Sequence, residues 1–223
     1  VLSVNQMTSC TNGCDGSTAE MTVDWFVKNR AGAIATAMSF ANDKKDQQCL
    51  STQKTETGAV VTGVTYLKTK DDQALMAEIA KNGPVGVDVD ATTAFQTYTG
   101  GLLTCTATDN QLNDAMTIVG YNTDDAAKPY WIVKNSWGPD WGDKGYVHLA
   151  MGEGKDCGVT SKPWTIAASA PVKTVFDWRT QGAIESVWNQ GMCGDAIAVD
   201  VATIAAANLY LANRTQGLAP LAI

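Results

Sequence analysis

Apolar residues recur along this chain in two spacings, one typical of amphipathic helices and one typical of strands. The helical spacing predicts three helices, at AEMTVDWFVKN (19–29), DQALMAEIAKN (72–82) and AIAVDVATIAAANLYLAN (196–213). Strand character marks AVVTGVTYLK, PVGVDVDA, MTIVGYN, YWIVKNSW and GYVHLAM, at residues 59–68, 84–91, 116–122, 130–137 and 145–151. The polar stretch 30–58 is expected to be loop, and 159–172 a connector.

Helix boundaries are also visible in the sequence. Ser17 and Glu20 have the spacing of a capping box before the first helix, and Asp71 is placed to cap the second, which Gly83 and Pro84 then stop. Helices therefore occupy both ends of the chain and strands its middle. This order predicts an α+β fold in which a helical part, built from both termini, packs on a central β part.

Composition narrows the function classes. The 223 residues carry a formal net charge of −7 and no basic stripe, which argues against nucleic acid or an anionic membrane surface as a partner. No apolar run approaches the ~20 residues of a membrane span. We expect a monomer.

Six cysteines at irregular spacing indicate three disulfides and an oxidising compartment. Only Cys10 and Cys14 are close in sequence, so a zinc site is not expected, and neither is any other metal or cofactor.

Several long motifs resemble one family. PYWIVKNSWGPDWGDKGYVHLAMGEGKDCGV (129–159) is similar to the C-terminal signature of papain-like cysteine peptidases, especially the cathepsin L-like branch. APVKTVFDWRTQGAIESVWNQGMCG (170–194) resembles that family's mature N-terminus. LSVNQMTSC and GCDG (2–16), with NGPVGVDVD and YTGGLLT (82–103), also match. The resemblance covers nearly the whole chain and implies two domains, one helical and one β-barrel-like, with a cleft between them.

The order of these segments departs from the family, because the N-terminal-like segment follows the C-terminal-like one. We interpret this as a circular permutation, which is tolerated when the original termini lie close together. The expected helical domain comprises residues 1–65 plus 181–223, and the β domain residues 66–180. The resemblance also implies the pairs Cys14–Cys193, Cys10–Cys49 and Cys105–Cys157, and a secreted or lysosomal-type origin.

The catalytic positions depart as well. Carried over motif by motif, the family's nucleophilic cysteine corresponds to Ala196 and its histidine to Asp114. The orienting asparagine is retained as Asn135, and the oxyanion-hole glutamine as Gln190. A thiol protease needs a thiolate and an imidazole, so that activity is not expected.

The surroundings of these positions are partly kept and partly changed. Trp137 and Trp141 match the family's cleft tryptophans, and Gly16 its substrate-binding backbone. Trp188 and Asp88, in contrast, are new at the cleft. We interpret the mixture as an active site rebuilt by engineering.

Two further aspartates have simple structural interpretations. Asp195 is expected to be the N-cap of the last helix. Asp200 is expected to face solvent or the helix dipole. The sole histidine, His148, is expected to be a plain surface residue.

We expect the cleft to hold a small molecule or a peptide, with Ala196, Trp137, Trp141, Trp188, Asp88 and Gly16 as ligand contacts. Asp114, oriented by Asn135 and with Gln190 facing developing charge on oxygen, fits general-base proton abstraction of the Kemp-elimination type. Asp88 is an alternative base. The competing hypothesis is a catalytically inactive papain-like scaffold that binds a peptide or other ligand.

Overall fold

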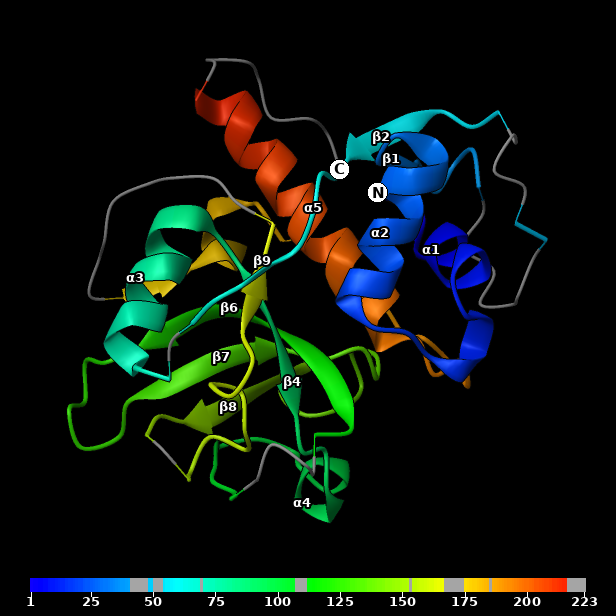
Figure 1. The fold of residues 1–223 in the computed structure, drawn as a ribbon. Helices are drawn as coiled ribbons and strands as arrows, with labels where there is room; N and C mark the ends of the chain where they lie inside the picture. Colours follow the sequence, from blue (N-terminus) through cyan, green and yellow to red (C-terminus); the bar gives the residue numbers. More distant parts are fainter. Residues whose placement is uncertain are drawn as a thin grey trace.

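The computed structural model describes residues 1–40, 48–49, 54–68, 70–106, 112–152, 154–166, 175–184 and 186–215. Helices α1 and α2 gather on one side of the molecule and most strands on the other, and the long helix α5 runs between them (Figure 1). The α+β fold class predicted from the sequence is confirmed. The helices and 3-10 turns of the described residues are α1 (Val4–Cys10), η1 (Gly13–Asp15), α2 (Ala19–Arg30), α3 (Asp72–Asn82), α4 (Thr93–Gln96), η2 (Trp178–Gln181) and α5 (Ala196–Thr215).

Side-chain caps set the helix starts. Asp71 caps α3 by accepting a hydrogen bond from the Gln73 backbone N–H at 3.0 Å, as the sequence predicted. The cap of α2 is Thr18, which accepts from the Met21 N–H at 3.1 Å, and not the predicted Ser17. The Ser17 hydroxyl instead lies 2.8 Å from that of Thr22, and with Thr18 as the N-cap the third helical residue is Met21, so the predicted capping box with Glu20 does not form.

The strands form two sheets. A small antiparallel sheet pairs β1 (Ala33–Ala35) with β2 (Thr57–Val60). The large sheet is antiparallel except for the β5–β8 pair. Its order is β3 (Thr65–Tyr66), β9 (Trp164–Thr165), β4 (Val85–Val89), β6 (Asp114–Asn122), β7 (Tyr130–Lys134), β8 (Tyr146–Ala150) and β5 (Leu102–Leu103), with β10 (Val175–Asp177) paired to β6.

Strand β6 is the centre of the large sheet. It pairs with β4, β7 and β10, and every residue from Ala115 to Tyr121 is buried. A strand covered on both faces reads as a continuous apolar run, which is the pattern of this segment. Its first residue, Asp114, pairs with Val89 at the end of β4, so this carboxyl group lies at the end of the central strands.

Most of helix α5 is buried on all sides because it has neighbours on all sides. Every residue from Ala196 to Ala207 is buried. The helix contacts α1, α2 and β2 on one side and β6 and β4 on the other. Its alanines allow both layers to approach closely, and they favour the helix intrinsically.

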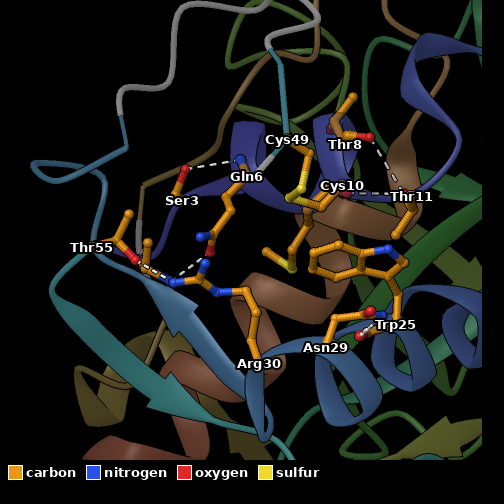
Figure 2. Close-up of a disulfide and its surroundings, with 12 residues drawn as sticks. Ser3, Gln6, Thr8, Cys10, Thr11, Trp25, Asn29, Arg30, Cys49 and Thr55 are labelled. Atoms are coloured by element: carbon orange, nitrogen blue, oxygen red, sulfur yellow. Dashed lines mark hydrogen bonds between the residues drawn. A yellow bond between two sulfur atoms is a disulfide. The ribbon is translucent and has the colours of Figure 1, made fainter. Parts of the chain in front are cut away.

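Three disulfides join the segments, with the pairing that the resemblance implied: Cys10–Cys49, Cys14–Cys193 and Cys105–Cys157. Figure 2 shows Cys10–Cys49 at the end of α1, beside Trp25 of α2. Nearby, the Arg30 guanidinium donates to the Thr55 hydroxyl at 2.6 Å. The Cys14–Cys193 bond fastens the loop before α2 to the segment that leads into α5.

Short strands are where the sequence predictions were wrong. The expected strand 59–68 is split between β2 and β3, which belong to different sheets, with Gly63 in the break. The expected loop 30–58 contains β1 and the start of β2, and the expected connector 159–172 contains β9. Residues 167–172 of that connector lie outside the described residues. Helix α1 was not predicted because its polar residues are buried by tertiary contacts.

Candidate functional site

A pocket of about 930 Å³, called the cleft below, opens between the start of α2 and the end of the large sheet. Its volume is in the range of pockets that hold a small ligand or a few peptide residues. It is lined by residues 12, 15–21, 66–67, 88, 112–115, 161–162, 164, 194 and 196–197. Of the predicted site residues, the structure brings Asp114, Ala196, Asp88 and Gly16 together in this lining.

The first turn of α5 forms one wall. Asp195 caps the helix by accepting from the Ala198 N–H at 3.2 Å, which confirms its expected role. Ala196 then places only a methyl group toward the cleft. Gly16 lies opposite with a φ of +86°, and a Cβ there would meet the Gly194 carbonyl oxygen at 3.1 Å. The wall therefore depends on glycine at this position.

Asp114 is the most perturbed ionisable group in the lining. Burial raises its pKa from 3.8 to about 6, against the lowering effect of two hydrogen bonds, from the Ala115 N–H and the Trp137 side chain. The Ala115 bond measures 2.8 Å. A carboxyl group that ionises near pH 6 changes charge within the physiological range.

The two groups expected to assist Asp114 are placed elsewhere. The Asn135 side-chain oxygen accepts from the Ser136 N–H at 2.7 Å, and its buried amide nitrogen has no partner among the described residues, so the expected bond to Asp114 is wrong. The Gln190 side-chain oxygen accepts from the Ser136 hydroxyl at 2.7 Å. Neither residue lines the cleft. Sequence reasoning could not foresee that Ser136 would hold both carboxamides.

The three tryptophans expected as ligand contacts do not line the cleft. Trp141 donates its indole N–H to the Phe95 carbonyl at 2.9 Å and stacks with Phe95 in the β-side core. Trp137 contacts Trp141 edge to face, with ring centroids 5.2 Å apart. Its link to the cleft is the hydrogen bond from its side chain to Asp114. Trp188 packs against the helical core. Each of these rings is partly buried and packs against apolar core.

Asp88, on β4, lines the cleft as expected and is half-buried. Burial raises its pKa, and the nearby charge of Lys162 lowers it. The prediction that Asp200 faces solvent is wrong. Its side chain is 3% exposed, and a carboxyl oxygen accepts a hydrogen bond from the Thr117 hydroxyl at 2.6 Å. The helical period alone could not reveal this, because it does not say that α5 has neighbours on every side.

Sequence reasoning missed other lining residues, among them Asp15, Glu20, Tyr66, Lys162 and Trp164. Trp164 is fully buried and its ring covers Gly86, where a Cβ would be only 2.2 Å from the ring. The sequence signal that could have revealed it is a tryptophan in the expected connector 159–172, because so large an apolar side chain is usually buried. Burial raises the pKa of Tyr66, and the charges of Glu20 and Asp88 raise it further, so the tyrosine lies near both carboxyl groups.

No thiol and no imidazole reaches the cleft. All six cysteines are in disulfides. His148 is half-buried on β8, beside Tyr130 and 4.0 Å from Asp143, and burial lowers its pKa. The described residues contain no cluster of three or more side chains able to hold a metal ion. Nor does any helix in the described ranges have the length and apolar character needed to cross a membrane.

Comparison with known proteins identifies the family. Residues 1–167 match the family described as papain family cysteine protease. Cysteine proteinase A of Leishmania mexicana is 38% identical over 178 residues, covering 76% of this chain and 48% of the relative. Cathepsin L of Sarcophaga peregrina is 34% identical over 152 residues, covering 67% and 44%.

Solved structures agree. The bromelain protease of Ananas comosus superposes with a TM-score of 0.64 at 28% identity, over 73% of this chain and 76% of that one. Procathepsin L2 of Tenebrio molitor larval midgut gives 0.66 at 29%, over 75% and 53%.

The chain therefore belongs to the papain family of cysteine proteases and has its α+β fold. It spans about half the length of these curated relatives. Family membership and three disulfides are typical of secreted or lysosomal proteins.

The raised pKa of Asp114 predicts a pH-dependent stability difference between the protein and its Asp114→Asn variant. A folded-state pKa of about 6 against 3.8 stabilises the fold fully below pH 4, and that contribution is lost as pH rises to about 6. The variant should therefore gain on the order of 2–3 kcal/mol relative to the parent between these pH values. Urea unfolding at pH 4 and 7 measures this.

Asp24→Asn, on the exposed face of α2, is the control and should follow the parent at both pH values. Parallel pH profiles for the parent and Asp114→Asn would contradict a buried, raised Asp114.

Proposed function

We propose that this chain is a papain-fold protein without thiol-protease activity, whose cleft binds a peptide or other ligand carrying positive charge. The observation that carries this proposal is the charge of the lining. Among the described residues, the lining contains four with carboxyl groups, Asp15, Glu20, Asp88 and Asp114, and one with an ammonium group, Lys162. Field lines from like charges concentrate in a concave, partly desolvated site and attract cations.

The proposed loss of protease activity rests on Ala196 and Asp114. We propose that they replace the family's nucleophilic cysteine and its histidine. Support comes from their positions at the start of α5 and of β6, both in the lining of one cleft. A methyl group cannot attack a carbonyl carbon, and a carboxylate without a thiol partner has nothing to activate. The interpretation of these substitutions as engineered stays a hypothesis.

We also propose that the chain is circularly permuted. The family match ends at residue 167, yet α5 packs inside the same fold against α1 and α2, and β10 pairs with β6. Residues beyond the match thus occupy the middle of the domain. This arrangement is expected if the family's N-terminal segment now follows its C-terminal one.

Disulfide mapping tests the permutation. If residues 175–215 complete their own domain, Cys14 and Cys193 are joined within one chain. The oxidised protein should then run as a monomer without reductant, and proteolysis should release the Cys14 peptide linked to the Cys193 peptide. Disulfide-linked dimers that disappear in a Cys14→Ala/Cys193→Ala variant would show instead that the segment completes a second copy.

Peptide binding tests the proposed function. Calorimetry should detect acetyl-Val-Lys-Val-Lys-amide, with an affinity about tenfold higher at low salt than for acetyl-Val-Gln-Val-Gln-amide, because the neutral peptide gains nothing from the acidic lining. Asp88→Asn should weaken the lysine peptide about threefold to tenfold.

The matched control is Asp24→Asn, which removes a carboxyl group outside the cleft and should leave both affinities unchanged. Equal affinities for the two peptides, or no binding of either, would refute charge-selected binding in this cleft.

A second candidate function is general-base proton abstraction, favoured by the pKa of Asp114, about 6. A base with this value is largely ionised at neutral pH and still accepts a proton readily. The carboxyl group faces a pocket that has the apolar side chains of Leu67, Trp164 and Ile197 in its lining. Gln190 and Asn135 do not line the cleft, so stabilisation of a developing oxyanion has less support than the base itself.

Deprotonation of 5-nitrobenzisoxazole measures this activity. The rate above buffer should rise with pH through about 6 and then level, because the ionised form is the base. Asp114→Asn should abolish the excess rate and Asp88→Asn should retain it. The opposite pattern would make Asp88 the base, and no excess rate in the parent would leave only the binding function.

A further inference from the structure

Below the cleft, two buried hydrogen bonds connect α5 to the large sheet. The Thr117 hydroxyl of β6 donates to an oxygen of the Asp200 carboxyl group of α5 at 2.6 Å, and the Lys134 ammonium of β7 donates to the Thr203 hydroxyl of α5 at 3.2 Å. Asp200 and Lys134 are each 3% exposed. Buried charged groups are expensive unless they are paired, so their presence at this one interface needs an explanation.

Asp200 lies close to the cleft although it does not line it. It follows Ala196 by four residues, so it lies on the same face of α5 one turn further in. The charges of Asp114 and Asp88, both in the cleft lining, act on it. Between the cleft and Asp200, this face of α5 carries only the methyl group of Ala196. A ligand at this wall would therefore lie near a second, hidden carboxyl group.

The groups around Asp200 leave its charge incompletely balanced. The sheet presents Asp114 on β6, Asp88 on β4 and Lys134 on β7. On the helical side, α1 carries no charged side chain. Helix α2 carries Glu20, Asp24, Lys28 and Arg30, of which Asp24 and Lys28 are exposed and paired with each other. One Asp200 oxygen, Oδ2, has no hydrogen-bond partner among the described residues. Burial accordingly raises the pKa of Asp200 to about 8, despite Thr117 and Lys134.

We propose that Asp200 is a hidden charge determinant of the cleft, which works with Asp114 as a coupled carboxyl pair across the interface between α5 and the sheet. The inference rests on the proposed binding of cationic ligands and names the group that adjusts the cleft to the ligand's charge. When a ligand brings positive charge to the wall at Ala196, the Asp200 carboxylic acid releases its proton to the buffer and becomes a carboxylate.

The coupling has a defined order. Asp114 ionises first, with a pKa of about 6, and its negative charge is one of the causes that hold the pKa of Asp200 near 8. Each ionisation adds negative charge near the ligand. The affinity for a ligand with two positive charges should therefore rise with pH in two steps, one for each carboxyl group.

Carbon NMR of carboxyl-labelled aspartates tests the pair without any ligand. The parent should show buried carboxyl resonances that titrate near pH 6 and near pH 8. Asp200→Asn should lose the upper titration and keep the lower. Asp114→Asn should lose the lower one and move the upper to lower pH, because the repelling charge is gone. An upper titration that persists in Asp200→Asn would overturn the inference.

Thr117→Val gives an independent readout should Asp200→Asn fail to fold. It removes the hydroxyl that favours the Asp200 carboxylate, so the upper titration should move to higher pH. An unchanged upper titration in this variant would also overturn the pair.

Calorimetry of acetyl-Val-Lys-Val-Lys-amide at pH 7, in buffers of different ionisation enthalpy, separates this inference from the proposed function. The parent should release roughly half a proton or more per peptide bound, and Asp200→Asn about a tenth. Binding without this difference would refute the role of Asp200 alone. Absence of binding, with both titrations present in the NMR spectra, would refute the ligand class and leave the pair standing.

Discussion

Helix α5 must be covered on every side, and the rest of the structure is arranged around this requirement. From Ala196 to Ala207 no side chain meets solvent appreciably, because α1 and α2 cover one flank and β6 and β4 the other. The helical side and the sheet are thus joined largely through one element, α5. Alanine makes this possible, since its small side chain lets both layers approach and costs no rotamer entropy. The cleft exists where this contact ends, at the first turn of α5.

The same burial determines the electrostatics of the site. Asp114 and Asp200 lie on opposite sides of the α5–β6 contact, and for both the largest effect on the pKa is loss of water. In a wetter groove these would be ordinary carboxylates. Here the apolar contact that holds the layers together also places titratable groups within the physiological pH range. Stability of the interface and chemistry of the cleft therefore have one physical origin.

The elements that the sequence predicted well are those with a strong local signal. The three long helices and the four strands of the middle region have clear periodicity, and the cap at Asp71 and the stop at Gly83 follow from backbone chemistry. The disulfide pairing came from the family resemblance, not from spacing. Two-residue strands such as β3 and β9 were not predicted, because they form through pairing with segments far away in the sequence and not through local preference. The domain boundaries at residues 65, 66, 180 and 181 stay a prediction.

The sequence by itself determined the fold class, the family and the absence of a free thiol or cleft histidine, because residue identity, long motifs and periodicity carry that information. Only the tertiary structure decided which side chains meet. In the structure, the side chain that hydrogen-bonds Asp114 is Trp137 and not Asn135. Trp141 and Trp188 pack against the cores, and Asp200, which was expected at the surface, is buried. The physical reason is that desolvation and hydrogen-bond choice depend on what packs from across the fold. The spacing of residues within one segment does not identify the side chains that pack against it from distant segments.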